Sequence, residues 1–148
     1  MKILMVCLGN ICRSPLAHGV MEHLVAQEGL DWEIESAGTG GYHIGSKPDY
    51  RSIEVAKALG IDISKQKALK FNSSDFDNYD HIFVMDHHNY EDVISLARNE
   101  VQKDKVKLFL EDRDVPDPYY NDELFKPVLE MITTQCAKLL TTLKAQKQ

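Results

Sequence analysis

Short apolar runs that alternate with amphipathic helical segments constrain the fold of this chain more than any other feature of its sequence. Continuous apolar runs are typical of strands buried in a parallel sheet, and alternating apolar and polar residues are typical of half-buried strands. These patterns predict four strands, at 2–6, 31–36, 81–86 and 105–110. Apolar residues at helical spacing predict helices at 15–29, 50–60, 87–98 and about 124–143, with a short helix beginning within 72–76. Because strands and helices alternate, we expect one α/β domain over residues 1–148, with a parallel sheet covered by helices on both faces.

The composition and charge argue against several classes of protein. The formal net charge of −6 disfavours broad binding to nucleic acids or anionic membranes, because both are polyanions. No apolar stretch approaches the roughly 20 residues needed to cross a bilayer, so we expect no membrane insertion. The first residues, MKILMV, lead into a polar loop instead of a small-residue cleavage site, so we interpret them as a buried strand and expect a cytoplasmic protein. The three cysteines, an odd number, form no disulfide framework and are catalytic, redox-active or simply buried.

Residues 7–15, CLGNICRSP, stand where the first strand turns into the first helix. A glycine and small polar residues in such a turn let backbone amides converge on an anion. Cys7 would face these amides, Arg13 could bind phosphate oxygens bidentately, and the Ser14 hydroxyl could reach the thiolate. The loop residues between them are Leu8, Gly9, Asn10, Ile11 and Cys12. The segment therefore predicts a phosphate site with a built-in nucleophile, and the competing interpretation is a structural turn with a buried thiol.

A second segment, DVPDPYY at 114–120, supplies a candidate acid. Attack by a thiolate on a phosphate ester needs an acid that protonates the departing oxygen. Ligands of an open α/β sheet lie at the carboxyl ends of its strands, so this loop and Cys7 should share one edge. Asp117 is held between two prolines, and Tyr119 and Tyr120 offer aromatic faces for a substrate ring. Alone, the segment would be a proline-rich surface turn; only its occurrence together with the cysteine loop favours a functional role.

The segments VCLGNICRSP and DVPDPYY resemble the two signatures of the low molecular weight protein tyrosine phosphatases. The resemblance spans the chain, with one signature near the amino terminus and the other before the last helix. It implies a four-stranded parallel sheet flanked by helices, the three-layer arrangement of flavodoxin-like and Rossmann-like folds. It also implies that Cys7 is the nucleophile, Arg13 the phosphate clamp, Ser14 the partner of the thiolate and Asp117 the general acid.

The same resemblance implies supporting roles for other residues. Asn10 would hold the strained shape of the loop through side-chain hydrogen bonds, and Cys12 would form a reversible disulfide with Cys7 under oxidation. Tyr42 would stand in the pocket wall, at a position where relatives often carry tryptophan or another residue. Animal relatives have a histidine that supports the loop asparagine near the position of Gln66, so that particular support is in question in this chain.

Other motifs are weaker. GGYHIGSK at 40–47 nearly spells a nucleotide-binding loop, but its serine and lysine stand in the wrong order. His87 and His88 follow Asp86 at a strand end; adjacent side chains on a helix diverge, so a polar helix start is the better interpretation than a metal site. Asp86 itself could support the site from the same edge of the sheet. Cys136 falls on the apolar stripe of the last helix. We expect neither a metal nor another cofactor.

These features together predict hydrolysis of protein phosphotyrosine and of small aryl phosphates through a cysteinyl-phosphate. The partners would be phosphotyrosine-containing proteins and, if the source is bacterial, a tyrosine kinase, which the resemblance to bacterial relatives implies. Three alternatives compete. Arsenate reductases of this fold need a further redox cysteine pair, whereas only Cys136 lies beyond the loop. Protein arginine phosphatases carry threonine where this chain has Ile11, and isoleucine favours tyrosine. A catalytically silent phosphotyrosine-binding module would need neither nucleophile nor acid.

Overall fold

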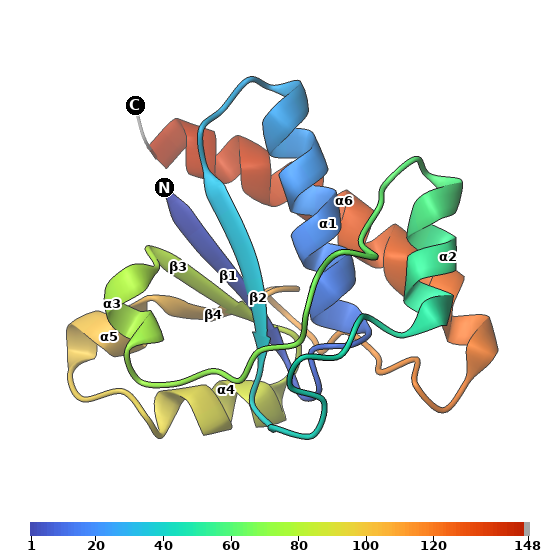
Figure 1. Ribbon diagram of the computed structural model, residues 1–148. Coiled ribbons are helices and arrows are strands. Elements are labelled where there is room, and N and C mark those ends of the chain that lie inside the picture. Colours follow the sequence, from blue (N-terminus) through green and yellow to red (C-terminus); the bar gives the residue numbers. More distant parts are fainter. Residues whose placement is uncertain (147–148) are drawn as a thin grey trace.

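The fold is built on a parallel sheet with the strand order β2-β1-β3-β4 (Figure 1). The computed structural model describes residues 1–146. The strands are β1 (Lys2–Cys7), β2 (Glu33–Gly38), β3 (His81–Val84) and β4 (Val106–Leu108). β1 pairs in parallel with both β2 and β3, and β3 pairs in parallel with β4. The predicted four-stranded parallel sheet is confirmed.

Helices cover both faces of this sheet, as predicted, because alternate side chains of β1 point to opposite sides. Ile3 and Met5 belong to one apolar cluster, whereas Leu4 and Val6 belong to the other. The first cluster lies under α1 (Arg13–Gln27), α2 (Tyr50–Ala58) and α6 (Phe125–Gln146). The opposite face carries α3 (Asp75–Asn78), α4 (His87–Ile94) and α5 (Glu100–Asp104) (Figure 1). Within residues 1–146, no helix is long and apolar enough to span a membrane.

Several predicted boundaries were wrong by a few residues. β2 begins and ends two residues later than the predicted 31–36, and β3 ends at Val84 instead of residue 86. β4 is shorter at both ends than 105–110, and α1 begins at Arg13, two residues before the expected proline. The predicted helix at 87–98 ends at Ile94. A further helix that was not predicted, α5, follows it, where the Asn99 side chain accepts a hydrogen bond from the Gln102 amide and caps its start.

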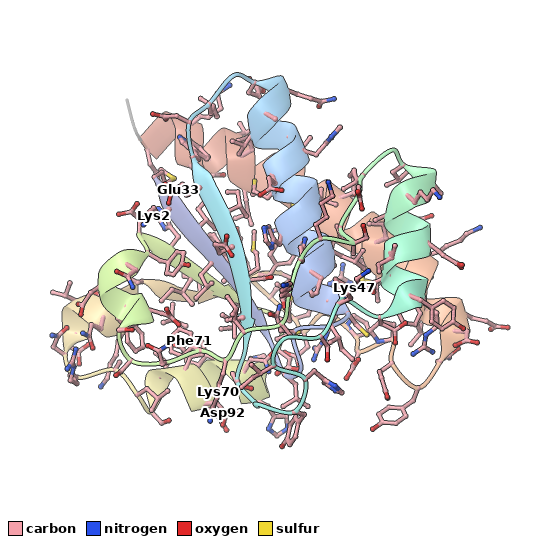
Figure 2. The ribbon with its side chains drawn as sticks, viewed as in Figure 1. Lys2, Glu33, Lys47, Lys70, Phe71 and Asp92 are labelled. Atoms are coloured by element: carbon pink, nitrogen blue, oxygen red, sulfur yellow. The ribbon has the colours of Figure 1, made fainter. Side chains whose placement is uncertain are left out.

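The strand order places a crevice at the carboxyl ends of β1 and β3. From β1 the chain crosses to β2 on one side, and it later returns to β3 and β4 on the other side. Ligands of doubly wound sheets bind where the order reverses in this way. Cys7 ends β1, and Asp86 follows β3 by two residues. At the opposite edge of the sheet the exposed Lys2 and Glu33 side chains form an ion pair of 3.3 Å (Figure 2).

The end of β2 supports the backbone of residues 7–14, which we call the phosphate loop. The Thr39 and Gly40 amides each donate a 2.9 Å hydrogen bond, to the carbonyls of Cys7 and Leu8 respectively. Gly38 packs so closely that a Cβ atom there would lie 2.7 Å from the Leu8 carbonyl oxygen and 3.1 Å from the Asn10 amide nitrogen. Glycine is therefore required at this point, because both neighbours are backbone atoms that cannot turn away.

Substitution Gly38→Ala is expected to lower the free energy of unfolding by about 1–3 kcal/mol, because the added methyl group overpacks against the phosphate loop. Chemical denaturation followed by circular dichroism measures this loss. Gly41→Ala is the control, since a Cβ atom there would meet only the ends of the Ile44 and Lys70 side chains at 3.4 Å. Equal stabilities for the two variants would contradict the predicted clash.

Candidate active site

A pocket of about 360 Å³ opens at the carboxyl edge of the sheet. Three segments line it: the phosphate loop, the loop after β2, and residues 114–120, which we call the acid loop. The lining residues are Cys7, Leu8, Gly9, Ile11, Cys12, Arg13, Tyr42, His43, Asp117, Tyr119 and Tyr120. The structure thus brings together every residue that was predicted to line or serve the site except Asn10 and Ser14, which support the loop from behind. Cys7 is buried, and its Sγ lies 3.0 Å from Ser14 Oγ.

Asn10 holds the phosphate loop in its tight turn. Its backbone is left-handed, with φ of 56°, a conformation that asparagine tolerates better than most residues. The Asn10 side chain donates to Ser14 Oγ at 2.7 Å and accepts from the Leu69 amide at 3.0 Å. Gln66 instead donates to the Pro15 carbonyl at 3.1 Å. The support of Asn10, which the sequence left in question, therefore comes here from Ser14 and Leu69.

The first turn of α1 faces the same pocket. Cys12 is the N-cap residue of α1, and its side chain makes no capping hydrogen bond. The amides at the start of a helix have no partners within the helix, and the helix dipole favours an anion there. Since Cys12 and Arg13 both line the pocket, this helix start is available to a phosphate group.

Arg13 is a buried cation with fixed partners. One guanidinium nitrogen, Nη1, donates to Asp86 Oδ2 at 2.8 Å and to the Val115 carbonyl at 3.0 Å. The other, Nη2, lies 3.8 Å from Asp117 Oδ2. Burial opposes the charged form, but Cys7, Asp86 and Asp117 outweigh it and raise the pKa of Arg13 above its ordinary value. Arg13 therefore remains positively charged inside the pocket.

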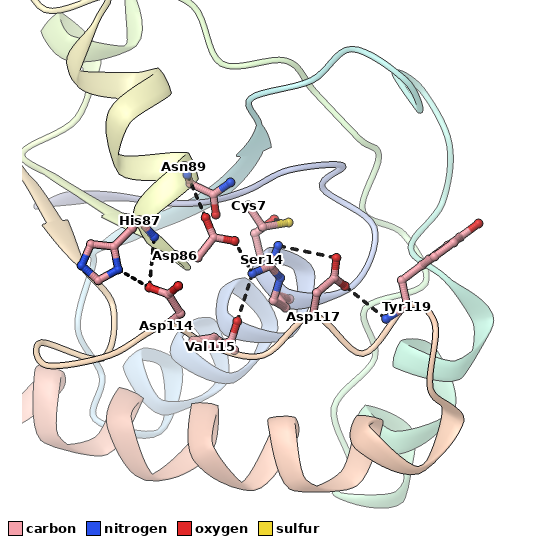
Figure 3. A network of polar contacts seen from close by, with 10 residues as sticks. Cys7, Ser14, Asp86, His87, Asn89, Asp114, Val115, Asp117 and Tyr119 are labelled. Atoms are coloured by element: carbon pink, nitrogen blue, oxygen red, sulfur yellow. Dashed lines mark hydrogen bonds and ion pairs between the residues drawn. The ribbon is translucent and has the colours of Figure 1, made fainter.

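Asp86 serves two groups at once (Figure 3). Its Oδ2 accepts from Arg13, and its Oδ1 accepts from the Asn89 amide at 2.8 Å and so caps α4. The sequence placed Asp86 at the correct edge but gave no sign of its pairing with Arg13, 73 residues away.

His87, in the polar helix start that the sequence predicted, bonds to Asp114 of the acid loop through Nδ1 at 2.5 Å and through its amide at 3.0 Å (Figure 3).

Asp117 stands at the mouth of the pocket. Its side chain is 41% exposed, and its Oδ1 accepts a 3.1 Å hydrogen bond from the Tyr119 amide (Figure 3). Tyr119 and Tyr120 pack edge to face with their ring centroids 4.9 Å apart. With Tyr42, which is largely exposed, they give the pocket aromatic walls. A carboxyl group thus faces a buried guanidinium across a space bounded by aromatic rings.

His43 is a lining residue that sequence reasoning missed. A Cβ atom on Gly9 would lie 3.2 Å from the His43 ring, so the ring packs on the backbone of the phosphate loop. No motif or spacing in the sequence marks this histidine. The position of His43 is set by the loop after β2, which is held by backbone hydrogen bonds. In this loop the Gly45 amide donates to the Ala68 carbonyl, and the Asp49 amide donates to the Ile11 carbonyl.

The three cysteines are free thiols in distinct surroundings. Cys12 is buried, and burial followed by the charges of Asp49 and Cys7 raises its pKa to about 12. Cys136 is fully buried in α6, and burial raises its pKa as well. Both of these side chains therefore stay protonated at neutral pH. Cys7, the predicted nucleophile, lines the pocket beside the Ser14 hydroxyl. The reversible disulfide between Cys7 and Cys12 stays a prediction.

Residues 1–146 contain no cluster of three or more histidine, cysteine or acidic side chains that could hold a metal ion.

The fold and this pocket define a class of α/β phosphate-binding proteins in which a cysteine ends the first strand and an arginine begins the first helix. Comparison with known families places the chain within this class. The family described as low molecular weight phosphotyrosine protein phosphatase matches residues 2–148, and the chain belongs to that family.

Named relatives match along their whole length. The low molecular weight protein-tyrosine-phosphatase YfkJ of Bacillus subtilis is 38% identical over 154 residues, which covers 99% of this chain and 98% of that protein. The crystal structure of a protein tyrosine phosphatase from Entamoeba histolytica, with Hepes in its active site, superposes with a TM-score of 0.93 at 36% identity and covers 100% of this chain and 99% of that one. The Drosophila arginine phosphatase DARP superposes with a TM-score of 0.90 at 30% identity, with 97% and 98% covered.

Substitution Asp86→Asn is expected to lower the free energy of unfolding by about 1.5–3 kcal/mol, because it removes the charge that neutralises buried Arg13. Asparagine still caps a helix, so this variant separates the two functions of Asp86. Asp86→Ala should cost about 1 kcal/mol more, since the cap of α4 is lost as well. Urea denaturation measures both values, with Asp92→Asn on the exposed side of α4 as control. Identical stabilities for Asp86→Asn and wild type would contradict the importance of the ion pair.

Proposed function

We propose that this protein hydrolyses phosphotyrosine in proteins, and small aryl phosphates, through a cysteinyl-phosphate intermediate. One observation carries the proposal: Cys7, Arg13 and Asp117 line a single pocket although 110 positions separate the first from the last. A nucleophile, a cation and an acid around one anion site are what two-step phosphoryl transfer requires. The names of the relatives, which are tyrosine phosphatases, support the same conclusion.

In the first step the Cys7 thiolate attacks phosphorus, so that an S–P bond forms while the bond to the tyrosine oxygen breaks. The Ser14 hydroxyl, 3.0 Å from Cys7 Sγ, can donate a hydrogen bond to the sulfur anion before attack and again when it departs. The loop amides and Arg13 bind the equatorial oxygens, where negative charge concentrates in the transition state. Because Asp86 and Val115 fix Arg13 in advance, little reorganisation accompanies the reaction.

Asp117 transfers a proton in both steps. It donates its proton to the departing phenolate oxygen in the first step and becomes a carboxylate. In the second step it takes a proton from the water that attacks phosphorus, and the S–P bond breaks to release inorganic phosphate and the Cys7 thiolate. The partly exposed position of Asp117 at the mouth of the pocket suits both roles, since the leaving oxygen and the incoming water occupy the same side of phosphorus.

The aromatic walls favour an aryl phosphate. Tyr42, Tyr119 and Tyr120 surround the space between the phosphate loop and solvent, so a flat phenyl ring can lie between them while its phosphate reaches Arg13. The partners are accordingly phosphotyrosine-containing proteins, among them a tyrosine kinase if the source is bacterial. A cytoplasmic location fits such substrates.

Cys7→Ser is expected to abolish turnover of an aryl phosphate, because the hydroxyl of serine is far less nucleophilic at neutral pH than a thiolate. Asp117→Asn should lower kcat/KM, which reports formation of the cysteinyl-phosphate, about 100-fold or more for phenyl phosphate, and much less for esters of strongly acidic phenols, which leave without protonation. Steady-state kinetics across a leaving-group series, with vanadate as a competitive inhibitor, measures both effects. Equal losses of kcat/KM across the series would refute the role of Asp117 as the acid, and full activity of Cys7→Ser would refute the mechanism.

Protein arginine phosphatase activity is the second candidate, favoured by the structural similarity to DARP. Ile11 argues against it, because its side chain lines the pocket where arginine phosphatases carry threonine. Arsenate reduction has less support, since Cys136 is buried in α6 and no further cysteine follows the loop.

Parallel assays on phosphotyrosine and phosphoarginine peptides of the same sequence separate the two candidates. We expect kcat/KM to favour phosphotyrosine by about tenfold or more, a difference that one pocket side chain can produce. Ile11→Thr should reduce this preference. A wild-type preference for phosphoarginine would overturn the proposed substrate and leave the covalent mechanism in place.

A further inference from the structure

Arg51, the second residue of α2, connects the two halves of the pocket although it does not line it. Its Nε and Nη2 donate to the two carboxylate oxygens of Asp49 at 2.9 and 2.8 Å, and its Nη1 donates to Asp122 Oδ1 at 2.5 Å. The guanidinium carbon also lies 4.5 Å from the centre of the Phe125 ring and 5.5 Å from that of Tyr119. All donor nitrogens of Arg51 thus engage carboxylates, while its flat face contacts two rings.

One side of this cluster is attached to the phosphate loop. Asp49 accepts from the Arg51 amide at 2.9 Å and so caps α2, and the Asp49 amide donates to the Ile11 carbonyl at 2.8 Å. The hydrogen bonds from Arg51 hold the pKa of Asp49 below its ordinary value. In turn, the carboxylates of Asp49 and Asp122 raise the pKa of Arg51. The bidentate pair is therefore fully charged at neutral pH and fixed to the nucleophile side of the pocket.

The other side of the cluster is attached to the acid loop. Tyr119, against which Arg51 packs, lines the pocket and donates its amide to Asp117 Oδ1 at 3.1 Å. Asp122 follows the acid loop, after a turn in which the Asn121 amide donates to the Pro118 carbonyl at 2.9 Å. The Asp117 side chain is 41% exposed, and besides the hydrogen bond from the Tyr119 amide it makes a 3.8 Å contact with Arg13. The segments on both sides of Asp117 therefore make contacts that end on Arg51.

We propose that Arg51 is a positioning residue that holds the acid loop, through Tyr119 and Asp122, at the distance from the phosphate loop at which Asp117 reaches the leaving oxygen. The pair with Asp49, which is bonded to the phosphate loop, and the contacts with Tyr119 and Asp122 meet on a single guanidinium. The separation of nucleophile and acid is thus set from outside the pocket. The catalytic part of this inference rests on the proposed hydrolysis of phosphate esters, and the structural part does not.

Amide hydrogen exchange tests the structural part without reference to any activity. Arg51→Lys keeps the charge but loses the bidentate geometry and the stacking on Tyr119. We expect the Tyr119 and Asn121 amides to exchange about tenfold faster in this variant, because the acid loop opens more often. Asp122→Asn, at an exposed position that does not endanger folding, should give a smaller increase in the same amides. Arg98→Lys is the matched control, since Arg98 is exposed and makes only a 3.8 Å contact with Asp77.

Leaving-group kinetics on the same variants test the catalytic part. Arg51→Lys should lower kcat/KM for phenyl phosphate about tenfold, with less than about a threefold loss for the ester of a strongly acidic phenol, because in the first step only phenyl phosphate needs the acid. The inhibition constant of vanadate should stay within about twofold of wild type, since the phosphate loop is intact. In an Asp117→Asn background the same substitution should have almost no further effect on phenyl phosphate, as expected for residues that act through one group.

If Arg51 had only a structural role, Arg51→Lys would lower kcat/KM equally for both esters, or its full effect on phenyl phosphate would persist in the Asp117→Asn background. Either result overturns the catalytic part of the proposal. Unchanged exchange of the Tyr119 and Asn121 amides in Arg51→Lys overturns the structural part. A wild-type protein that hydrolyses no aryl phosphate would refute the proposed function instead, and the exchange rates would still decide whether Arg51 holds the acid loop.

Discussion

The buried charge of Arg13 is the interaction on which the rest of the site depends. A guanidinium removed from water is strongly destabilising unless carboxylates and carbonyl groups surround it. Here its partners come from the segment after β3 and from the acid loop, and the acid loop follows all four strands in the sequence. Because the Arg13 guanidinium needs these partners, segments that are distant in the sequence meet around the end of β1. Arg13 also lines the pocket, where its positive charge favours an anionic ligand.

The elements of the fold were predictable because their signals are local. The apolar run at 2–6 and the turn residues after it indicate a buried strand followed by a helix without any knowledge of the remaining chain. Errors occurred where local signals conflict or end gradually. The segment 87–98 continues in apolar periodicity past Ile94, but Asn99 offers the backbone a new cap and a second helix begins. Both helices contact β4, and the apolar pattern of the sequence does not contain these contacts.

The candidate site was predictable to the extent that its chemistry is concentrated in two short segments. Cys7 and Arg13 lie within seven positions of each other, and Asp117 is marked by its flanking prolines. The sequence did not predict the contacts of Asp86, His43 and Arg51, because each of these residues has a partner that is far away in the sequence. Arg51 and Asp122, for example, are 71 positions apart. An acidic or basic residue carries no sign of its partner until the topology is known.

The dual use of the Asp86 carboxylate couples two events that are otherwise separate. One oxygen begins α4 and the other neutralises Arg13, so the order of the first turn of that helix and the charge balance of the pocket are thermodynamically linked. A change at this one carboxylate therefore affects the helix start and the buried guanidinium together. Helix α4, on the face of the sheet away from α1, is thus connected to the cation of the pocket although it contributes no residue to the pocket wall.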